Sequence, residues 1–520
     1  ETEVSFYIPE LLPSGFFLVN GQYKYLTNQI IVNPVFYFKK DEGKLTTVYS
    51  SCTIINKKLK NDISYIQLYA GGYKFPAILL YLYKLGMKKT SEILGFNYKI
   101  SEIKMEGSIK LPDSRYILFE PKNSTAEKFL YGFSIFLKYL PAKPFDEENT
   151  SVWENVIINF LGNRNSIYIL DQIYTHIITV IERPILKSLG YSLELPYLLK
   201  EIADNVIAGK VNQRNDISNQ RIRTSELVSA FLLKHVLSSY NEYENKIDSG
   251  DENAKFYTNE HKIFSEIINS QNIQTLENIN PAEELAFLTK VTPVGVGGIP
   301  DLVAVSPSSL NIHDSYYGQI DPLETPASDG IGVQQQLAMG IDLRNVRGTL
   351  GKKNPAKTNP TEMLSTTSSL IPFMESNEGA RVLMATNQAK QAVPLINSEI
   401  PSVMTGFESI LSQYVSDSFV KRSPVDGVVS YVDNFIITVK DSSGKEHSID
   451  ITPVRVKSGQ GKNGLSIFDA NVKVGQKVKT GDVLAYSKNV KNGIISNGIN
   501  ILVAFMPWEG MNFEDGMVVS

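Results

Sequence analysis

Apolar and polar residues follow two different periods along the first half of this 520-residue chain. In residues 16–38, aromatic and β-branched residues flank the turn dipeptide Asn20-Gly21, which is the pattern of a β-hairpin. From about 75 to 95 and from 125 to 240, apolar residues recur at helical spacing. The pattern therefore predicts a β-rich start and a mainly α-helical middle.

Two stretches break this pattern before regular spacing returns. Residues 238–260 are polar and charged, which predicts an exposed loop or helix tip. In residues 291–360, Gly and Pro recur every few positions, so turns should shape the backbone there. Beyond residue 425 we expect a β-rich end, because apolar and polar residues alternate again in residues 427–441, 473–487 and 499–508.

The most apolar stretches, residues 75–85 and 129–140, are shorter than the roughly 18 residues that span a bilayer. We expect them to be core helices. No basic segment followed by an apolar segment opens the chain, so no secretory signal is visible.

Composition predicts a globular chain of three or more domains, since 42% of the residues are hydrophobic and 20% are charged. The formal net charge of -4 gives no overall positive field, so any contact with nucleic acid must be local or completed by partners. Cys52 is the single cysteine, which excludes an internal disulfide, and we expect it to be structural. The five histidines show no zinc-site spacing.

Two motifs carry only weak signals. Residues 473–485 have the Gly and Val rhythm of biotinyl and lipoyl carrier hairpins but lack the carriers' lysine tripeptide, which favours a barrel-sandwich hairpin without a cofactor. The Gly- and Pro-rich residues 344–360 form a basic loop that either contacts phosphates or is solvated and balanced by acidic residues elsewhere. Its cations are Arg344, Arg347, Lys352, Lys353 and Lys357.

Glu514 and Asp515 are adjacent carboxylates between apolar stretches. Burying both is unfavourable unless a cation or basic partner balances them. Their oxygens suit Mg²⁺, which takes one or two carboxylates and leaves its other positions to phosphates and water. A structural or capping role is the alternative.

Seven segments, in order, resemble segments of the β subunit of multisubunit DNA-directed RNA polymerases. The last two segments are the most specific, and they include SLIPF, QAVP, VAFMPW and NFED. The seven segments are residues 15–38, 73–86, 216–228, 280–299, 312–332, 369–396 and 497–520.

The resemblance implies a mixed α/β multidomain chain. We expect a first protrusion segment at 1–45, a lobe at 46–215, a returning protrusion segment at 216–275 and a fork at 276–345. We then expect an active-site segment of a double-psi β-barrel at 346–420, a barrel-sandwich hybrid at 421–490 and further β-barrel strands at 491–520.

The resemblance also implies site residues. Asp515, with Glu514 beside it, would assist a second Mg²⁺ that arrives with the nucleotide, while the main Mg²⁺ site lies on a partner β′ chain. Arg381 would face the incoming triphosphate, and Gln391 would face the end of the growing RNA. We also expect nucleic acid near Asn387, Lys390, Lys290 and Glu324.

This chain departs from the family pattern in three places. The fork's basic run becomes Phe287, Leu288, Thr289 and Lys290, which leaves one positive charge. The loop that begins at Glu324 has lost an acid and an amide of the family pattern. Residues 338–371 are a much shorter stretch than in cellular β subunits, which puts the phosphate role of the basic loop in doubt.

Because a β subunit continues beyond the NFED motif, we expect other polypeptides to complete the enzyme. The expected partners are a C-terminal β chain, β′ chains, a promoter-specificity factor, DNA template, RNA product and nucleoside triphosphates, with no membrane. Split β subunits of this kind resemble those of giant (jumbo) phages, which implies an infected bacterial cytoplasm or a virion. The alternatives are a catalytically degenerate β-like scaffold and a two-barrel RNA-dependent RNA polymerase.

Overall fold

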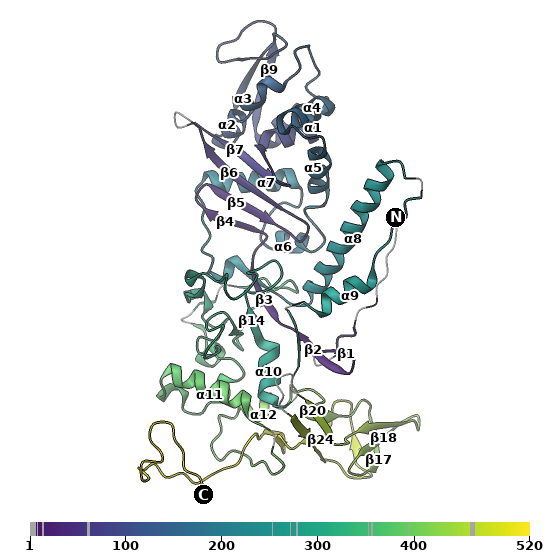
Figure 1. Ribbon diagram of the computed structural model, residues 1–520, viewed down its shortest axis with the longest axis vertical. Coiled ribbons are helices and arrows are strands. Elements are labelled where there is room, and N and C mark those ends of the chain that lie inside the picture. Colours follow the sequence, from purple (N-terminus) through teal and green to yellow (C-terminus); the bar gives the residue numbers. More distant parts are fainter. Residues whose placement is uncertain are drawn as a thin grey trace.

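The architecture is mixed α and β, as the sequence predicts, and comprises several separate sheets. No sheet closes into a barrel within the described ranges. The body is elongated. The five-stranded sheet of residues 35–76 and its helices lie toward one end, and the C-terminal strands lie at the other (Figure 1). The computed structural model describes residues 7, 9–12, 15–59, 63–251, 253–270, 272–276, 279–351, 353–354, 357–393, 395–457 and 463–520.

A five-stranded antiparallel sheet lies in the upper part of the body in Figure 1. Its register places Leu45 beside Cys52 and Cys52 beside Ala70, and all three side chains are buried. Burial raises the pKa of the Cys52 thiol to about 12, which fits the expected structural role. The first strand lies on the N-terminal side of the boundary expected between residues 45 and 46, and the second strand crosses that boundary. In order, the strands are β4 (Val35–Lys39), β5 (Glu42–Thr46), β6 (Ser51–Lys58), β7 (Ser64–Ala70) and β8 (Tyr73–Pro76).

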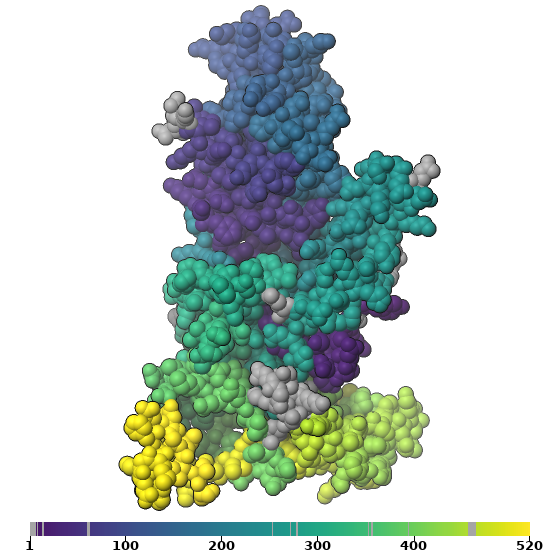
Figure 2. Space-filling view, in the orientation of Figure 1, coloured from purple at the N-terminus to yellow at the C-terminus, as the bar shows by residue number. Residues whose placement is uncertain are grey.

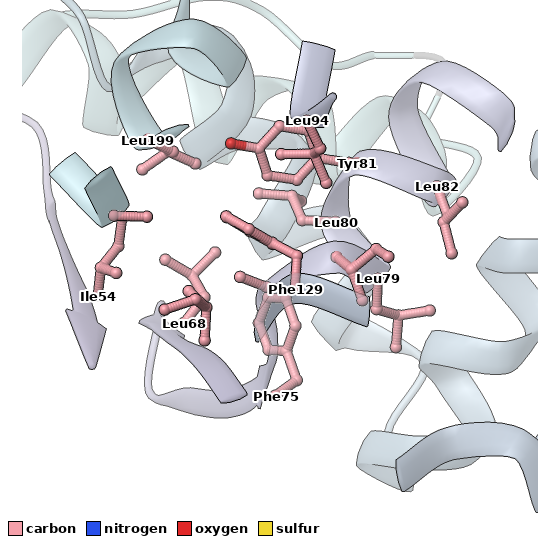
Figure 3. Packing of buried hydrophobic residues seen from close by; sticks show 14 of the residues in the cluster. Ile54, Leu68, Phe75, Leu79, Leu80, Tyr81, Leu82, Leu94, Phe129 and Leu199 are labelled. Atoms are coloured by element: carbon pink, nitrogen blue, oxygen red, sulfur yellow. The ribbon is translucent and has the colours of Figure 1, made fainter. Parts of the chain in front are cut away.

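Helices pack on this sheet and share one hydrophobic core with it. Figure 3 shows Phe75, Leu79 and Phe129 meeting in that core, which confirms that residues 75–85 and 129–140 are core segments. The helices are α1 (Ala77–Leu94), α2 (Ser124–Tyr131), α3 (Phe133–Phe136), α4 (Thr150–Leu161), α5 (Asn165–His176), α6 (Glu182–Ser188) and α7 (Leu195–Ile207). A small sheet of β9 (Phe96–Ser101), β10 (Ile109–Lys110) and β11 (Tyr116–Pro121) lies beside them.

The predicted hairpin at Asn20-Gly21 is confirmed. Strands β1 (Phe17–Val19) and β2 (Gln22–Leu26) pair antiparallel, and β13 (Ile273–Thr275) extends their sheet. Asn20 and Gly21 have φ values of 52° and 74°, the left-handed backbone that a tight hairpin turn requires.

The next sheet joins segments that are far apart in the sequence. Arg221 in this sheet forms a buried ion pair with Glu226, with 2.6 Å between Nη2 and Oε1. The sheet therefore fixes the start of α8, which begins at Glu226. Its strands, in order, are β12 (Gln220–Arg223), β3 (Asn28–Val32), β14 (Lys290–Thr292) and β15 (Gln335–Gln336).

Residues 238–260 contain the expected helix tip. Helix α8 (Glu226–Asp248) continues eleven residues into this stretch, and α9 (Glu260–Ile268) folds back beside it. Both helices project from the side of the body in Figure 1. His235 Nε2 lies 2.7 Å from Glu266 Oε2 and joins the two helices.

The Gly- and Pro-rich middle is shaped by turns and short 3-10 helices, as predicted. Within it lie η4 (Pro307–Leu310) and η5 (Asp314–Tyr316). Helix η7 (Pro360–Met363) begins at its last residue, and η8 (Ser368–Leu370) and η9 (Met374–Ser376) follow it. The longer helices around this region are α10 (Pro281–Thr289), α11 (Gly379–Gln391) and α12 (Phe407–Leu411).

The predicted β-rich end is confirmed between Val420 and Ile495. One sheet has the order β16-β24-β22 and another β19-β18-β17-β23, and their buried residues form a shared core. The strands are β16 (Val420–Arg422), β17 (Gly427–Val432), β18 (Ile436–Asp441), β19 (Glu446–Asp450), β20 (Val454–Lys457), β21 (Asn463–Ser466), β22 (Phe468–Ala470), β23 (Lys477–Val478), β24 (Val483–Ser487), β25 (Val490–Lys491) and β26 (Ile494–Ile495).

The strand predicted at residues 499–508 is wrong for this chain. These residues carry no strand, and Leu502 and Phe505 are almost fully exposed. The apolar alternation is present, but no strand of the described chain lies beside it to pair with its backbone. Figure 2 shows the end of the chain, in yellow, at the outer edge of the molecule.

Glu284 is a buried carboxylate that joins α10 to the segment before β16. It accepts hydrogen bonds from the backbone N–H and the hydroxyl of Ser416, both at 2.6 Å. Burial raises the pKa of Glu284 to about 7, although the two bonds from Ser416 oppose this change.

This raised pKa predicts how stability depends on pH. The folded chain keeps a proton on Glu284 up to about pH 7, whereas the unfolded chain releases it near 4.5. The free energy of unfolding should therefore fall between about pH 4.5 and 7 and level off above that range. Glu284→Gln should lack this contribution, so its stability relative to the parent should rise across the same range in urea unfolding. A difference independent of pH would contradict the assignment.

Candidate functional site

Helix α11 carries four of the expected site residues. Asn387, Lys390 and Gln391 are three and four residues apart, so they lie near one face of its last turns. Arg381 lies near the start of the helix, about 15 Å along the axis from Gln391. The two ends of α11 can therefore serve two different parts of one site.

A cavity of about 170 Å³ opens beside the last turns of α11. It is bordered by α10, the start of β14, the loop that begins at Glu324, and β15. The structure brings five expected residues together here, although they are far apart in the sequence: Lys290, Glu324, Asn387, Lys390 and Gln391.

Two further amides line the cavity, and sequence reasoning did not find them. They are Gln334 and Gln336, of which Gln336 lies on β15 and accepts a hydrogen bond from the Thr289 hydroxyl at 2.9 Å. Phe287 also lines the cavity and stacks on Tyr25, with 4.9 Å between ring centroids. The lining therefore combines amides, two lysines, an aromatic ring and the carboxylates of Glu283 and Glu324.

Lys390 is held by a buried ion pair. Its Nζ lies 2.6 Å from Oε1 of Glu324, whose side chain is fully buried, and the Ser365 hydroxyl donates to the other carboxylate oxygen. The neighbouring Asp321 accepts hydrogen bonds from the backbone N–H groups of Leu323 and Ser365, both at 2.7 Å. The loop that begins at Glu324 is thus fixed to α11 by a charge-assisted hydrogen bond.

Lys290 is the uncompensated charge of the cavity. Burial, together with the nearby Lys390, lowers the pKa of Lys290. Among the described residues, its ammonium has no hydrogen-bond or ion-pair partner, whereas Lys390 has Glu324. An anionic group that enters the cavity could therefore pair with Lys290, whereas Lys390 is already paired with Glu324.

Three expected site residues lie outside this cavity. Arg381 is exposed, and its nearest polar contact is the Met384 sulfur, 3.7 Å from Nη1. Glu514 and Asp515 are exposed on the segment after residue 498.

The described residues form no cluster of three or more His, Cys, Asp or Glu side chains that could hold a metal. The exposed pair Glu514 and Asp515 nevertheless offers the donor chemistry expected for a Mg²⁺ ion that brings its own phosphate and water ligands.

Three of the five cations of the basic loop face carboxylates. Lys353 Nζ lies 3.0 Å from Glu362, Arg344 Nε lies 3.7 Å from Asp342, and Arg347 Nη1 lies 3.8 Å from Glu226. Lys352 lies outside the described residues. These contacts favour the loop balanced by acidic residues over a loop open to phosphates.

Among the residues that the structure describes, no helix is long and apolar enough to cross a membrane.

Two family models match separate parts of the chain. A family described as "Bacteriophage RNA polymerase" matches residues 51–299. A family described as "RNA polymerase Rpb2, domain 6" matches residues 367–520, the part that contains α11, Glu514 and Asp515.

Several curated relatives are described as DNA-directed RNA polymerase subunit beta. The protein of Mesomycoplasma hyopneumoniae is 28% identical over 381 residues, 60% of this chain and 31% of that protein. That of Fusobacterium nucleatum is 29% identical over 307 residues, 48% of this chain and 25% of that protein. That of Prochlorococcus marinus is 30% identical over 315 residues, 48% of this chain and 28% of that protein. The chain spans less than a third of these relatives, and they confirm the expected resemblance to β subunits.

The two lysines of the cavity should respond in opposite directions to loss of charge. Lys290→Gln removes an uncompensated ammonium and should raise the thermal unfolding midpoint of the chain. Lys390→Gln leaves the buried Glu324 without its cation and should destabilise the chain by about 2 kcal/mol. Thermal unfolding of the parent and both variants at one pH tests this. Changes of the same sign would contradict the assigned charge pattern.

Proposed function

We propose that this chain is the N-terminal part of a split β subunit, and that it contributes residues that contact nucleotide and RNA to template-directed RNA synthesis from DNA. The observation that carries the proposal is the cavity beside α11. It gathers side chains from the segments that resemble the fork and active site of β subunits, and it leaves Lys290 unpaired. Partial similarity to β subunits supports the same reading.

The proposed roles follow the two ends of α11. Arg381 faces the triphosphate of the incoming nucleotide. Asn387 and Gln391, about 9 and 15 Å further along the helix, face the RNA end. Lys290 supplies positive charge to a phosphate of the nucleic-acid backbone, and Glu324 holds Lys390 in place.

Nucleotidyl transfer needs no side-chain nucleophile from this chain. The RNA 3′ hydroxyl displaces pyrophosphate in line at phosphorus, and positive groups stabilise the attacking and leaving oxygens. Mg²⁺ supplies part of that charge when bound. Its main site belongs to the partner β′ chain, and Asp515, beside Glu514, assists the second ion, which arrives with the nucleotide.

Partner chains are expected at the segment after residue 498. Its apolar side chains are exposed and its residues form no strand, a combination that favours pairing with strands of another polypeptide. The proposed partners are a C-terminal β chain, β′ chains and a promoter-specificity factor. The family described as "Bacteriophage RNA polymerase" supports a phage enzyme that works in an infected bacterium or from a virion.

The scaffold alternative rests on one observation. Arg381 and Asp515 do not meet in the cavity within this chain, so the structure leaves their joint action to the assembled enzyme. A residue of the reaction centre should change the rate of RNA extension, whereas a scaffold residue should change assembly.

Charge removal at the reaction centre tests this difference. The assembled polymerase is purified by an affinity tag on this chain. With Arg381→Ala or Asp515→Ala it should still assemble and bind template, but it should extend RNA roughly a hundredfold more slowly. Asp515→Ala should recover part of its rate at high Mg²⁺, because the weakened step is entry of the second ion.

Two exposed residues far from α11 provide charge-matched controls, Arg164→Ala and Glu106→Ala. Both controls should extend RNA at the parental rate. Normal assembly and parental extension by Arg381→Ala and Asp515→Ala would reject the site and favour the scaffold.

A further inference from the structure

Asn280 is a fully buried amide at the start of α10. Its Oδ1 accepts a hydrogen bond from the backbone N–H of Ala282 at 2.9 Å, the ordinary role of an asparagine that caps a helix N-terminus. That bond uses only the oxygen of the side chain. The nitrogen remains free to bind elsewhere.

The Asn280 side-chain nitrogen caps the C-terminal end of helix α11. Nδ2 donates to the carbonyl oxygens of Ala389, Lys390 and Ala392, at 2.7, 3.1 and 3.1 Å. The last carbonyls of a helix have no partner within it, and a left-handed glycine often satisfies them. Here the residue after the helix is Ala392, with φ -58°, so a side chain more than a hundred residues earlier performs that task.

A third segment meets the same amide. Asn497 Nδ2 donates to Asn280 Oδ1 at 2.9 Å. Asn489 Nδ2 lies 3.4 Å from both Asn497 Oδ1 and the carbonyl of Ile279. Asn280 therefore joins α10, which leads into Lys290, to α11 and to the base of the segment that carries Glu514 and Asp515.

We propose that Asn280 is a positioning residue for RNA synthesis, which holds the last turn of α11 so that Asn387 and Gln391 meet the RNA end. This rests on the function proposed above. Loss of the bonds to α11 should displace its C-terminal turn but leave Arg381, about 15 Å away, largely in place. Positioning of the RNA end should suffer, while binding of the nucleotide triphosphate should not.

Asn280→Asp is the sharpest variant. It keeps the oxygen that caps α10 and accepts from Asn497. It cannot donate to the α11 carbonyls of Ala389 and Lys390 or to that of Ala392. Asn259→Asp is the matched control, because the Asn259 side chain caps α9 by accepting from Lys262 and does not bridge to another helix. Asn280→Ser is a second variant that loses the same donors without adding charge.

The measurement is single-nucleotide RNA extension by the assembled polymerase on a DNA template with a preformed RNA primer. For both Asn280 variants we expect the rate constant to fall by about tenfold or more, because small misplacements of reacting groups slow reactions strongly. The fraction of complexes that extend, and the KM for the incoming nucleotide, should stay within about twofold of the parent. Asn259→Asp should match the parent in all three quantities.

Three results would overturn the proposal. They are a parental rate constant in the Asn280 variants, a defect confined to the fraction of active complexes, and failure of both variants to assemble, since the last two indicate a purely structural role. If the parental complex itself shows no template-dependent extension, the function on which the proposal rests has failed, and this outcome is distinct from the others.

Discussion

The carbonyl groups that end α11 are satisfied by an amide from another helix. Asn280 supplies that amide from inside the core, where each unpaired carbonyl would be unfavourable. Helix α10, which begins after Asn280, is also fixed by Glu284 to Ser416 and leads into the short strand that starts at Lys290. The positions of Lys290, of the last turns of α11 and of the segment after Asn497 all depend on this one junction.

The electrostatics of the cavity follow from the same placement. Lys390 is tied to Glu324, which is itself held by Ser365, so this pair contributes rigidity and little net charge. Lys290 lines the same cavity without an ion-pair partner among the described residues, and its pKa is lowered. An anionic ligand would offset the unfavourable burial of that ammonium, which is how a chain of net charge -4 can still favour phosphate at one local site.

Local patterns predicted the local structure. The Asn20-Gly21 dipeptide identified the first hairpin because few other residues adopt its left-handed turn, and apolar spacing identified the core helices around Phe75 and Phe129. The cavity residues were expected from resemblance to family motifs. Periodicity alone could not place Lys290 and Gln391 in one cavity, because the two residues are about a hundred positions apart.

Two misses have physical causes. Gln336 and Asn280 act through hydrogen bonds with distant segments, and such bonds leave no local sequence pattern. Gln334 reaches the cavity only through the fold of its loop. The strand predicted at residues 499–508 failed because alternation describes a surface that suits a sheet, while strand formation also needs a neighbour for the backbone. The described chain supplies none there.

The central claim is that the last turns of α11 and the cavity beside them receive the end of the RNA. The most direct test uses a transcribing complex whose RNA carries a photoreactive uridine at its 3′ end, irradiated and mapped by mass spectrometry. The account predicts crosslinks within residues 379–391 or at Lys290. Crosslinks confined to other chains, in complexes that still extend RNA, would contradict it.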